Sequence, residues 1–236
     1  MKLVVIGDLH GRGVWLDIVK KESADKYVFI GDYFDSFSFD ISFEHQDVNF
    51  RELIKFKEEN EDKVVILIGN HDLHYMKNIE ERCSGYQSKY RYRIEEMLDN
   101  AFNKNYLKIC YKYNDFVFTH AGITKTWYET FITKDGVNLE KIEEDLNDYL
   151  KYKPNVYNFN IGKNNSYYGD DITQSPLWVR PNSLSMDSID GIKQVVGHTA
   201  VNGIRFENNL ILIDCLDYKN EYLIIDGNEI TIKEIK

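Results

Sequence analysis

The sequence predicts an α/β protein in which a mixed β-sheet system is flanked by helices. Short β-rich runs that end in turn signals recur along the chain, helical patterns separate the first three of them, and the second half is rich in strands. At 236 residues the chain is long enough to bury one sizeable core, and no linker rich in Pro, Gly and Ser divides it. We therefore expect a single domain over residues 1–236 with one insertion.

Each predicted strand is a short apolar run. The runs lie at residues 3–6, 27–30, 64–68, 116–119, 194–196, 210–213 and 222–225. Apolar residues at helical spacing occupy residues 14–19, between the first two runs, and residues 50–56, before the third. The first half is therefore predicted as β-α-β-α-β. The chain closes with a predicted hairpin, in which residues 223–226 turn through Gly227 and Asn228 into residues 229–235.

Residues 152–176 differ in composition from the rest of the chain. They are rich in Asn, Tyr and Gly around Pro154 and show little periodicity. Such a stretch is typical of a long loop that carries function. We therefore predict that the insertion is a cap or loop at about residues 152–176.

The charge balance excludes one class of partner. Lys and Arg total 29 against 39 for Asp and Glu, which gives a net charge of −10. Such a charge repels a long polyanion, so we expect no binding to long nucleic acids. A small anionic substrate still fits if cationic side chains lie near the site.

The cysteine pattern and the hydropathy of the chain predict a cytoplasmic location. The three cysteines are odd in number and form no CxxC pair, which favours reduced thiols. The apolar run after Lys2 is too short for a signal peptide, and no span of roughly 18 apolar residues occurs. We expect a soluble cytoplasmic protein with no membrane partner; the sequence indicates no oligomeric state.

Polar clusters follow five of the predicted strands. In chain order they are GDLHG with Asp8 and His10, GDYFD with Asp32 and Asp35, GNHD with Asn70, His71 and Asp72, THAG with His120, and GHT with His198. Turn chemistry explains any one cluster, because Gly and Asp are ordinary turn formers and a lone His is usually structural. Turns do not require His in four of five clusters, so the set favours a functional site.

These clusters have the donor chemistry of a metal centre. Carboxylates, imidazoles and one amide, without cysteine, suit Mn²⁺, Fe or Zn²⁺ in a catalytic site better than a structural zinc site. In an extended segment Asp8 and His10 share one face and reach one ion. Six candidate ligands fit two ions roughly 3.5–4 Å apart that share a carboxylate and a hydroxide, an arrangement suited to in-line attack on phosphorus. We therefore expect a phosphoesterase with two divalent ions, manganese being our first choice.

The blocks GDLHG, GDYFD, GNHD, THAGI and VVGHT resemble, in that order, the signature blocks of calcineurin-like metallophosphoesterases, particularly of the phosphoprotein-phosphatase type. They span residues 7–199, most of the chain. The resemblance implies two mixed β-sheets that pack face to face and are flanked by helices. It also implies a metal pair at the ends of the sheets.

The resemblance implies a role for each matched residue. Asp8 and His10 would bind the first metal, Asp32 would bridge both metals, and the second would be completed by Asn70, His120 and His198. His71 would be the general acid that protonates the leaving oxygen, and Asp35 would hold its far nitrogen. His45 and His74 are not among the matched ligands.

One position departs from the family pattern. In the phosphatases that this sequence resembles, the acid matching Asp35 is followed by Arg-Gly, and that arginine clamps the phosphate. Here Ser36 and Phe37 follow instead. We therefore expect another arginine to bind phosphate. Arg180, in SPLWVRP, matches a segment of related bacterial and phage enzymes, and Arg12 is the second candidate.

Further motifs leave the substrate class open. WVRP and the short chain resemble small bacterial or phage phosphatases, which implies a Ser/Thr protein phosphatase that hydrolyses phosphomonoesters by direct attack of a metal-bridging hydroxide. GNHDLHYM, HAGIT followed by Trp127, and YGD are more similar to symmetrical dinucleoside tetraphosphate hydrolases. A small phosphodiesterase is a further alternative. Tyr167, Tyr168 and Trp178 are candidates to stack on a nucleotide base or a substrate side chain.

A binding scaffold without catalysis is the competing class. Such a protein would have lost metal ligands, whereas all six candidates and the acid are present here. We therefore favour an enzyme whose partners are a phosphorylated protein or a small phosphate ester or nucleotide.

Overall fold

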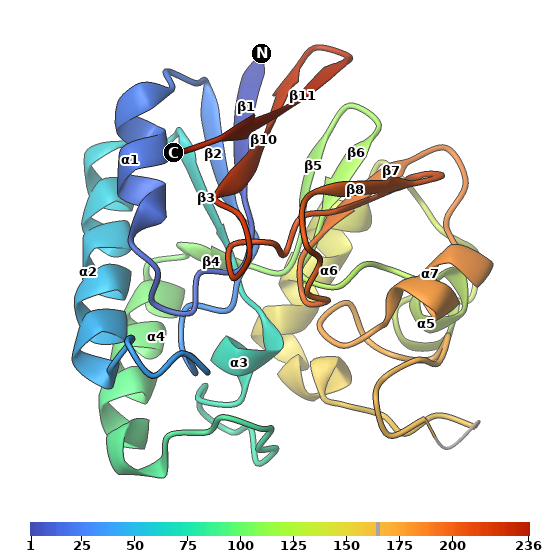
Figure 1. The fold of residues 1–236 in the computed structure, drawn as a ribbon. Helices are drawn as coiled ribbons and strands as arrows, with labels where there is room; N and C mark the ends of the chain where they lie inside the picture. Colours follow the sequence, from blue (N-terminus) through green and yellow to red (C-terminus); the bar gives the residue numbers. More distant parts are fainter. Residues whose placement is uncertain (164–165) are drawn as a thin grey trace.

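Two mixed β-sheets form the centre of the fold, and helices cover them (Figure 1). The computed structural model describes residues 1–163 and 166–236. One sheet has six strands in the order β11-β10-β1-β2-β3-β4, and the other has five in the order β5-β6-β7-β9-β8. Both sheets contain parallel and antiparallel pairs. The predicted α/β class with two mixed sheets is confirmed.

The six-stranded sheet has a parallel centre. Its parallel strands are β1 (Lys2–Ile6), β2 (Lys26–Phe29), β3 (Val64–Leu67) and β4 (Leu107–Lys108). The closing hairpin, β10 (Glu221–Asp226) and β11 (Glu229–Glu234), adds antiparallel to the free edge of β1. The predicted strands at residues 3–6, 27–30, 64–68 and 222–225 agree with β1, β2, β3 and β10 to within one residue at each end, and the predicted hairpin agrees to within two; β4 was not predicted.

The five-stranded sheet contains three strands that the sequence predicted and two that it did not. The predicted ones are β6 (Phe116–Phe118), β7 (Lys193–Val196) and β9 (Leu210–Leu212), which are mutually parallel. The additional strands are β5 (Tyr111–Tyr113) and β8 (Arg205–Glu207), which pair antiparallel at the two edges. These edge strands, like β4, span two or three residues and carry too short a pattern to be recognised.

Both predicted helices are present, and both are longer than predicted, α2 by far the more. The helical elements are α1 (Val14–Lys21), α2 (Phe43–Glu59), α3 (Asn70–Leu73), η1 (Ser88–Tyr90), α4 (Arg91–Asn103), α5 (Lys125–Phe131), α6 (Ile142–Tyr152), η2 (Pro154–Tyr157) and α7 (Pro181–Met186). The start of α2 is a capping box, in which Ser42 Oγ accepts from the backbone N–H of His45 and His45 Nδ1 accepts from the backbone N–H of Ser42. Histidine replaces the usual Glu or Gln, which hides this start from sequence patterns.

The core is divided by the alternation of side chains along the strands. Leu3 and Val5 of β1 belong to a buried cluster that includes Phe116 of the second sheet, so this cluster joins the two sheets. Val4 and Ile6 point the other way, into the cluster that includes Trp15 of α1. Because both faces of the central strands are buried, their sequences read as continuous apolar runs.

The predicted insertion follows α6 and contains η2. Among its described residues it has no further helix or strand, and residues 164 and 165 lie outside the described part. Tyr157 anchors it, because this buried side chain donates to the carbonyl oxygen of Leu146 at 2.6 Å, while Ser175 Oγ donates to the carbonyl oxygen of Tyr157. Tyr167 and Tyr168 are exposed. That the segment is an insertion into a single domain remains a prediction.

In residues 1–163 and 166–236, no helix combines the length and the apolar character needed to cross a membrane.

A buried carboxylate ties α1 to the first sheet. Glu22 follows α1, and its carboxylate lies 2.9 Å from Lys2 Nζ, 2.8 Å from Lys233 Nζ and 3.0 Å from the hydroxyl of Tyr222. Burial raises the pKa of Glu22, but hydrogen bonds from Lys233, Lys2 and Tyr222 outweigh it and lower the pKa to about 2. The ionised form is therefore favoured in the folded protein.

We expect Glu22→Gln to destabilise the fold in a pH-dependent way. A carboxylate with a lowered pKa contributes stability above its unfolded pKa of about 4.3, and this contribution disappears as pH falls through the folded pKa. The variant should lose on the order of 1–3 kcal/mol of unfolding free energy at neutral pH, and the loss should shrink towards pH 2. Urea unfolding across this pH range measures it, with the exposed Glu229→Gln as control. A difference that does not change with pH would contradict the account.

Candidate active site

The structure brings the five polar clusters together at one end of the two sheets. Each follows the carboxyl end of a parallel strand, in the chain order β1, β2, β3, β6 and β7. Such strand ends are where α/β proteins bind ligands. The clusters surround a cavity of about 240 Å³, whose lining includes Asp8, His10, Asp32, Asn70, His71 and His198. His120 is fully buried beside it.

Asp32 is the residue that the candidate ligands share. Its Oδ2 lies 3.6 Å from His10 Nε2 and 3.4 Å from His120 Nε2. Asp8, His10 and Asp32 form one group whose donor atoms lie within 4.8 Å of one another, and Asp32, His120 and His198 form a second. Two groups with one carboxylate in common have the arrangement expected for two ions that share a bridging ligand.

Asn70 joins the second group through its amide oxygen. This Oδ1 lies 3.0 Å from His120 Nε2 and 3.0 Å from His198 Nδ1. Asn70 begins α3 directly after β3, so the helix start holds its side chain beside both histidines. All six predicted ligands therefore lie in one contiguous cluster.

Unpartnered atoms and crowded acids indicate that this cluster suits cations. Asp8 Oδ1 and His198 Nε2 are buried and have no hydrogen-bond partner among the described residues. Burying such atoms without a partner is unfavourable. Burial, reinforced by the charge of Asp214, raises the pKa of Asp8 well above its usual range. Burial likewise raises the pKa of Asp72 to about 7. A cation would give the unpartnered atoms a partner and would stabilise the ionised carboxylates. The donor set therefore fits divalent ions.

Backbone carbonyls orient two of the histidines. His10 Nδ1 lies 2.6 Å from the carbonyl oxygen of Phe34, and His120 Nδ1 lies 3.1 Å from that of Ile30. A proton on Nδ1 in each ring leaves Nε2 free to ligate a metal. Burial lowers the pKa of His10 to about 4, which keeps this ring neutral.

Backbone strain is concentrated at the same residues. Eight described residues other than glycine have positive φ; four are asparagines, and the others are His10, Asp32, Asp35 and His198. Asparagine, aspartate and histidine adopt this conformation more readily than other residues, but it is still less favourable than a negative φ. All four residues that are not asparagine lie at the candidate site, where the surrounding structure holds them in this conformation.

His71 lies beside the candidate ligands and is held by Asp35. Its Nδ1 lies 3.1 Å from Asp35 Oδ2, and its backbone N–H donates to Asp32 Oδ1 at 2.9 Å. Asp35 Oδ1 accepts from the hydroxyl of Tyr75 at 2.6 Å and from Gln87 Nε2 at 3.1 Å. Burial lowers the pKa of His71, but the charges of Asp32 and Asp35 outweigh it and hold the pKa well above its usual range. The arrangement favours a protonated imidazole at the rim of the cavity.

The two candidate arginines lie in different surroundings. Arg180 lines the cavity, and it donates through Nε to the carbonyl oxygen of Tyr168 and through Nη1 to Thr199 Oγ1 and the carbonyl oxygen of His198. No residue in the described part of the chain accepts a bond from its Nη2. Arg12 donates to the side chain of Asp217 and is not part of the cavity lining. The geometry therefore favours Arg180 over Arg12 as the anion-binding residue.

Asp214, Phe37 and Trp178 also line the cavity and were not predicted as part of the metal site. Asp214 follows β9, so a sixth strand end with an acid was available as a signal in the sequence. Burial and the charge of Asp32 raise the pKa of Asp214 to about 6. Phe37 is 65% exposed, and its ring lies 5.8 Å from that of His71. Phe37 thus forms an apolar wall beside His71, and Ser36 stands where the family has its arginine.

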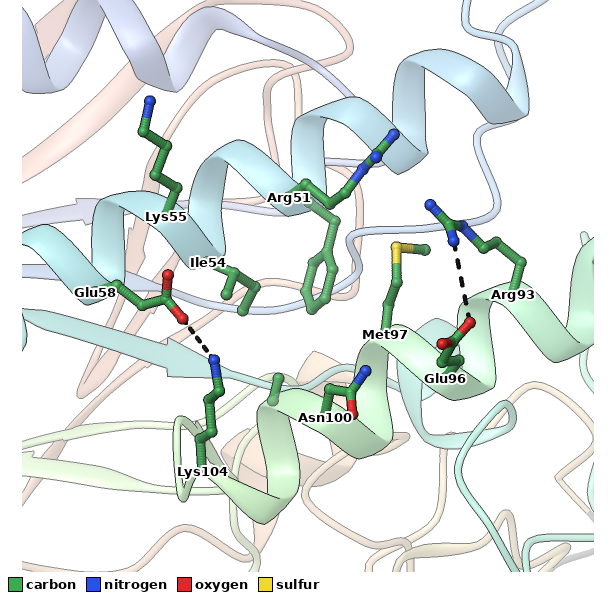
Figure 2. A pocket seen from close by; sticks show the side chains of 11 residues that line it. Arg51, Ile54, Lys55, Glu58, Arg93, Glu96, Met97, Asn100 and Lys104 are labelled. Atoms are coloured by element: carbon green, nitrogen blue, oxygen red, sulfur yellow. Dashed lines mark hydrogen bonds and ion pairs between the residues drawn. The ribbon is translucent and has the colours of Figure 1, made fainter.

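A larger cavity lies elsewhere in the described structure. It has about 380 Å³ and runs between α2 and α4 (Figure 2). Two pairs of its charged side chains contact each other: Glu58 and Lys104 at 2.6 Å, and Glu96 and Arg93 at 4.0 Å. None of the candidate metal-ligating groups found in residues 1–163 and 166–236 lies in its lining, so the strand ends are the candidate active site.

Comparisons with known proteins bear on the family and the fold of the chain. A family model described as calcineurin-like phosphoesterase matches residues 1–213. No curated protein sequence matches the chain significantly. Among solved structures, a mutant cold-active protein tyrosine phosphatase matches with a TM-score of 0.57 and 21% identity, over 100% of this chain and 80% of its own. A protein serine/threonine phosphatase from Saccharomyces cerevisiae matches with a TM-score of 0.57 and 16% identity, over 99% and 79%. At these identities the two structures establish similarity of fold alone.

Proposed function

Because the chain belongs to the calcineurin-like phosphoesterase family, whose members hydrolyse phosphate esters with divalent metal ions, we propose that it is a phosphomonoesterase with a two-metal centre at the strand ends. The observation that carries the proposal is the pair of ligand groups that share Asp32, with His71 at the rim. Asp8 and His10 would hold one ion, and Asn70, His120 and His198 the other. Bound there, the ions would activate the attacking water and neutralise charge on the phosphoryl oxygens.

The remaining residues position and protonate the substrate. His71, oriented by Asp35, would donate its proton to the leaving oxygen from the side of the cavity that Phe37 closes. Arg180 would bind a phosphoryl oxygen through the part of its guanidinium that the protein leaves unpaired. Arg12 is held by Asp217, and we assign it at most a supporting role.

Arg180→Ala should therefore raise KM and lower kcat together. Removing a charge-assisted contact to the phosphoryl group weakens both the bound substrate and the transition state. We expect kcat/KM to fall by about a hundredfold. Steady-state kinetics with 4-nitrophenyl phosphate measure the effect, and Arg205→Ala, an exposed arginine of β8, is the matched control. Kinetics of Arg180→Ala that equal those of the control would remove Arg180 from the site.

A phosphorylated Ser/Thr protein is the substrate that we propose first. The cavity opens beside a second cavity of about 310 Å³, since Trp178, Arg180 and Ser84 line both. Tyr167 and Tyr168 of the insertion line only the second one. An extended, partly aromatic groove of this kind suits a peptide that carries a phosphate, and we propose Mn²⁺ as the metal.

A dinucleoside tetraphosphate is the second candidate, because the same aromatic side chains offer surfaces on which a base can stack. The test compares kcat/KM for a phosphoserine peptide and for diadenosine tetraphosphate, in Mn²⁺, on one preparation. A preference for the peptide by about a hundredfold supports the protein phosphatase. A similar preference for the dinucleotide would overturn it and make Tyr167 and Tyr168 the next residues to replace.

A further inference from the structure

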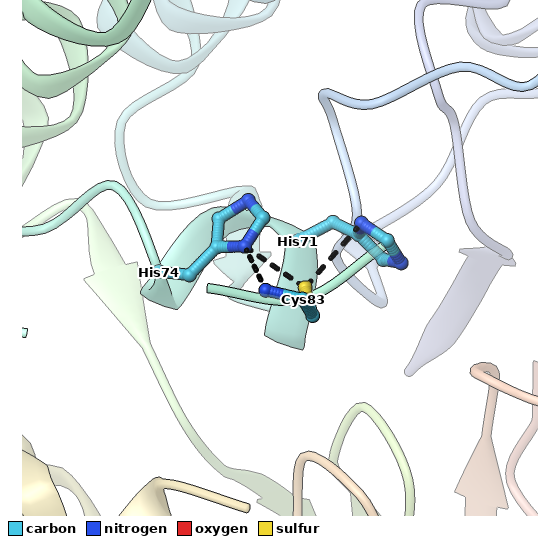
Figure 3. A group of neighbouring side chains, drawn as sticks. All are labelled: His71, His74 and Cys83. Carbon is cyan, nitrogen blue, oxygen red and sulfur yellow. Dashed lines mark hydrogen bonds between the residues drawn. The ribbon is translucent and has the colours of Figure 1, made fainter. Parts of the chain in front are cut away.

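A second group of metal-ligating side chains lies behind the proposed general acid. His71, His74 and Cys83 each offer one ligand atom, and these atoms all lie within 4.8 Å of one another (Figure 3). Cys83 Sγ is 2.8 Å from His74 Nδ1 and 3.8 Å from His71 Nδ1. None of the six proposed ligands of the metal pair belongs to this group. We propose that these three residues form an inhibitory site for Zn²⁺.

The spacing and chemistry of the group suit zinc. Zn–S bonds of about 2.3 Å and Zn–N bonds of about 2.0–2.1 Å place a sulfur and a nitrogen ligand roughly 3.5 Å apart in a tetrahedral site. The two S···N distances here, 2.8 and 3.8 Å, bracket that value. A thiolate with two imidazoles is a ligand set for zinc, and it differs from the cysteine-free set of the catalytic pair. Water would complete the fourth position.

The surroundings of His74 orient its Nδ1 towards Cys83. Its Nε2 lies 2.7 Å from Asp35 Oδ2, and its Nδ1 accepts from the backbone N–H of Cys83 at 3.2 Å. A proton on Nε2, facing Asp35, would leave the Nδ1 lone pair directed towards Cys83. A carboxylate behind the far nitrogen is the usual support for a histidine that ligates zinc.

The site is accessible from the outer cavity. Cys83 is half-buried, whereas the other two cysteines, Cys110 and Cys215, are buried. Cys83 lines the cavity of about 310 Å³ together with Arg180 and Trp178, so an ion can reach the thiol without unfolding of the core.

Zinc binding here would affect catalysis through His71. The ion would take the Nδ1 position that now contacts Asp35 at 3.1 Å, and the thiol proton and the Nδ1 proton of His71 would pass to solvent. His71 would lose the contact that orients it as the proton donor. The inhibition, unlike the binding, rests on the proposed role of His71.

Cobalt as a probe tests the binding without reference to activity. Metal-free protein is titrated with Co²⁺, which reports a thiolate ligand by a charge-transfer absorption in the near ultraviolet. We expect this band in the wild type and in Cys110→Ala, and its loss in Cys83→Ser. His74→Gln should weaken Co²⁺ binding at this site by about tenfold or more. The absence of a thiolate band in the wild type, or a band that persists in Cys83→Ser, would overturn the site.

Zinc inhibition tests the consequence. Mn²⁺-loaded enzyme is assayed with added Zn²⁺, and each variant is compared with its own zinc-free rate. We expect at least about tenfold inhibition in the wild type and in Cys110→Ala, and a much smaller effect in Cys83→Ser. If zinc inhibited Cys83→Ser as strongly as the wild type, the inhibitory zinc would bind elsewhere and the proposal would be wrong. An inactive wild type that keeps the cobalt band would contradict the proposed function and leave the site intact.

Discussion

Replacing Asp32 with Asn is expected to lower kcat by on the order of a thousandfold or more. Asp32 is the one residue common to both ligand groups, and its Oδ2 lies within 3.6 Å of His10 Nε2 and 3.4 Å of His120 Nε2. The amide removes a negative charge and one of the two equivalent oxygens. It should therefore weaken the binding of both ions, whereas a change at His10 or His198 should affect mainly one.

Two measurements on the same sample check this expectation. Metal content after dialysis should fall from two equivalents towards none, and turnover of 4-nitrophenyl phosphate should fall with it. Asp226→Asn, at the exposed end of β10, is the matched control and should retain both ions and its turnover. If Asp32→Asn kept two ions and near-native turnover, Asp32 would not be the shared ligand.

The second large effect is expected for His71→Asn. The imidazole lies at the cavity rim and is held by Asp35 at 3.1 Å, as a proton donor to the leaving group should be. Loss of a general acid costs about a hundredfold to ten-thousandfold in rate. The loss should be largest for phosphoserine, whose alkoxide is a poor leaving group, and smallest for 4-nitrophenyl phosphate.

Metal content separates this role from that of a ligand. His71→Asn should keep both ions, because neither ligand group of the metal pair includes His71. His45→Asn, at an exposed position of α2, is the matched control. Should His71→Asn lose its ions, the assignment of acid and ligand would be wrong.

The strands were predictable because the fold buries them on both faces. Continuous apolar runs such as Val64–Leu67 end abruptly at Gly and Asp, so their limits can be read within one residue. The later helices were not predicted, since α4 and α6 bury only Ile94, Leu98, Ala101, Ile142, Leu146 and Leu150, a sparse apolar stripe among charged residues. Pairing of β10 with β1 joins the two ends of the chain, and no local pattern encodes it.

The metal-ligand cluster was predictable because its residues directly follow strands whose ends could be recognised. A ligand that directly follows a strand stays close to the carboxyl edge of the sheet, whatever conformation the following loop adopts. The six predicted metal ligands lie together at this edge. Site residues whose positions depend on the path of a loop could not be predicted from the sequence. Cys83 lies near His74 because the backbone after α3 turns back on the helix, and Phe37 reaches His71 through an irregular segment. The single-domain organisation with an insertion remains a prediction.

Anomalous diffraction from crystals soaked in Mn²⁺ tests the central claim most directly, because the hard ion avoids the Cys83 thiol and reports only the oxygen- and nitrogen-rich cluster. The account predicts two peaks in the cavity at the strand ends, one at Asp8 and His10 and one at Asn70, His120 and His198, with Asp32 in contact with both. A single peak, or peaks that do not touch Asp32, would contradict the two-metal centre.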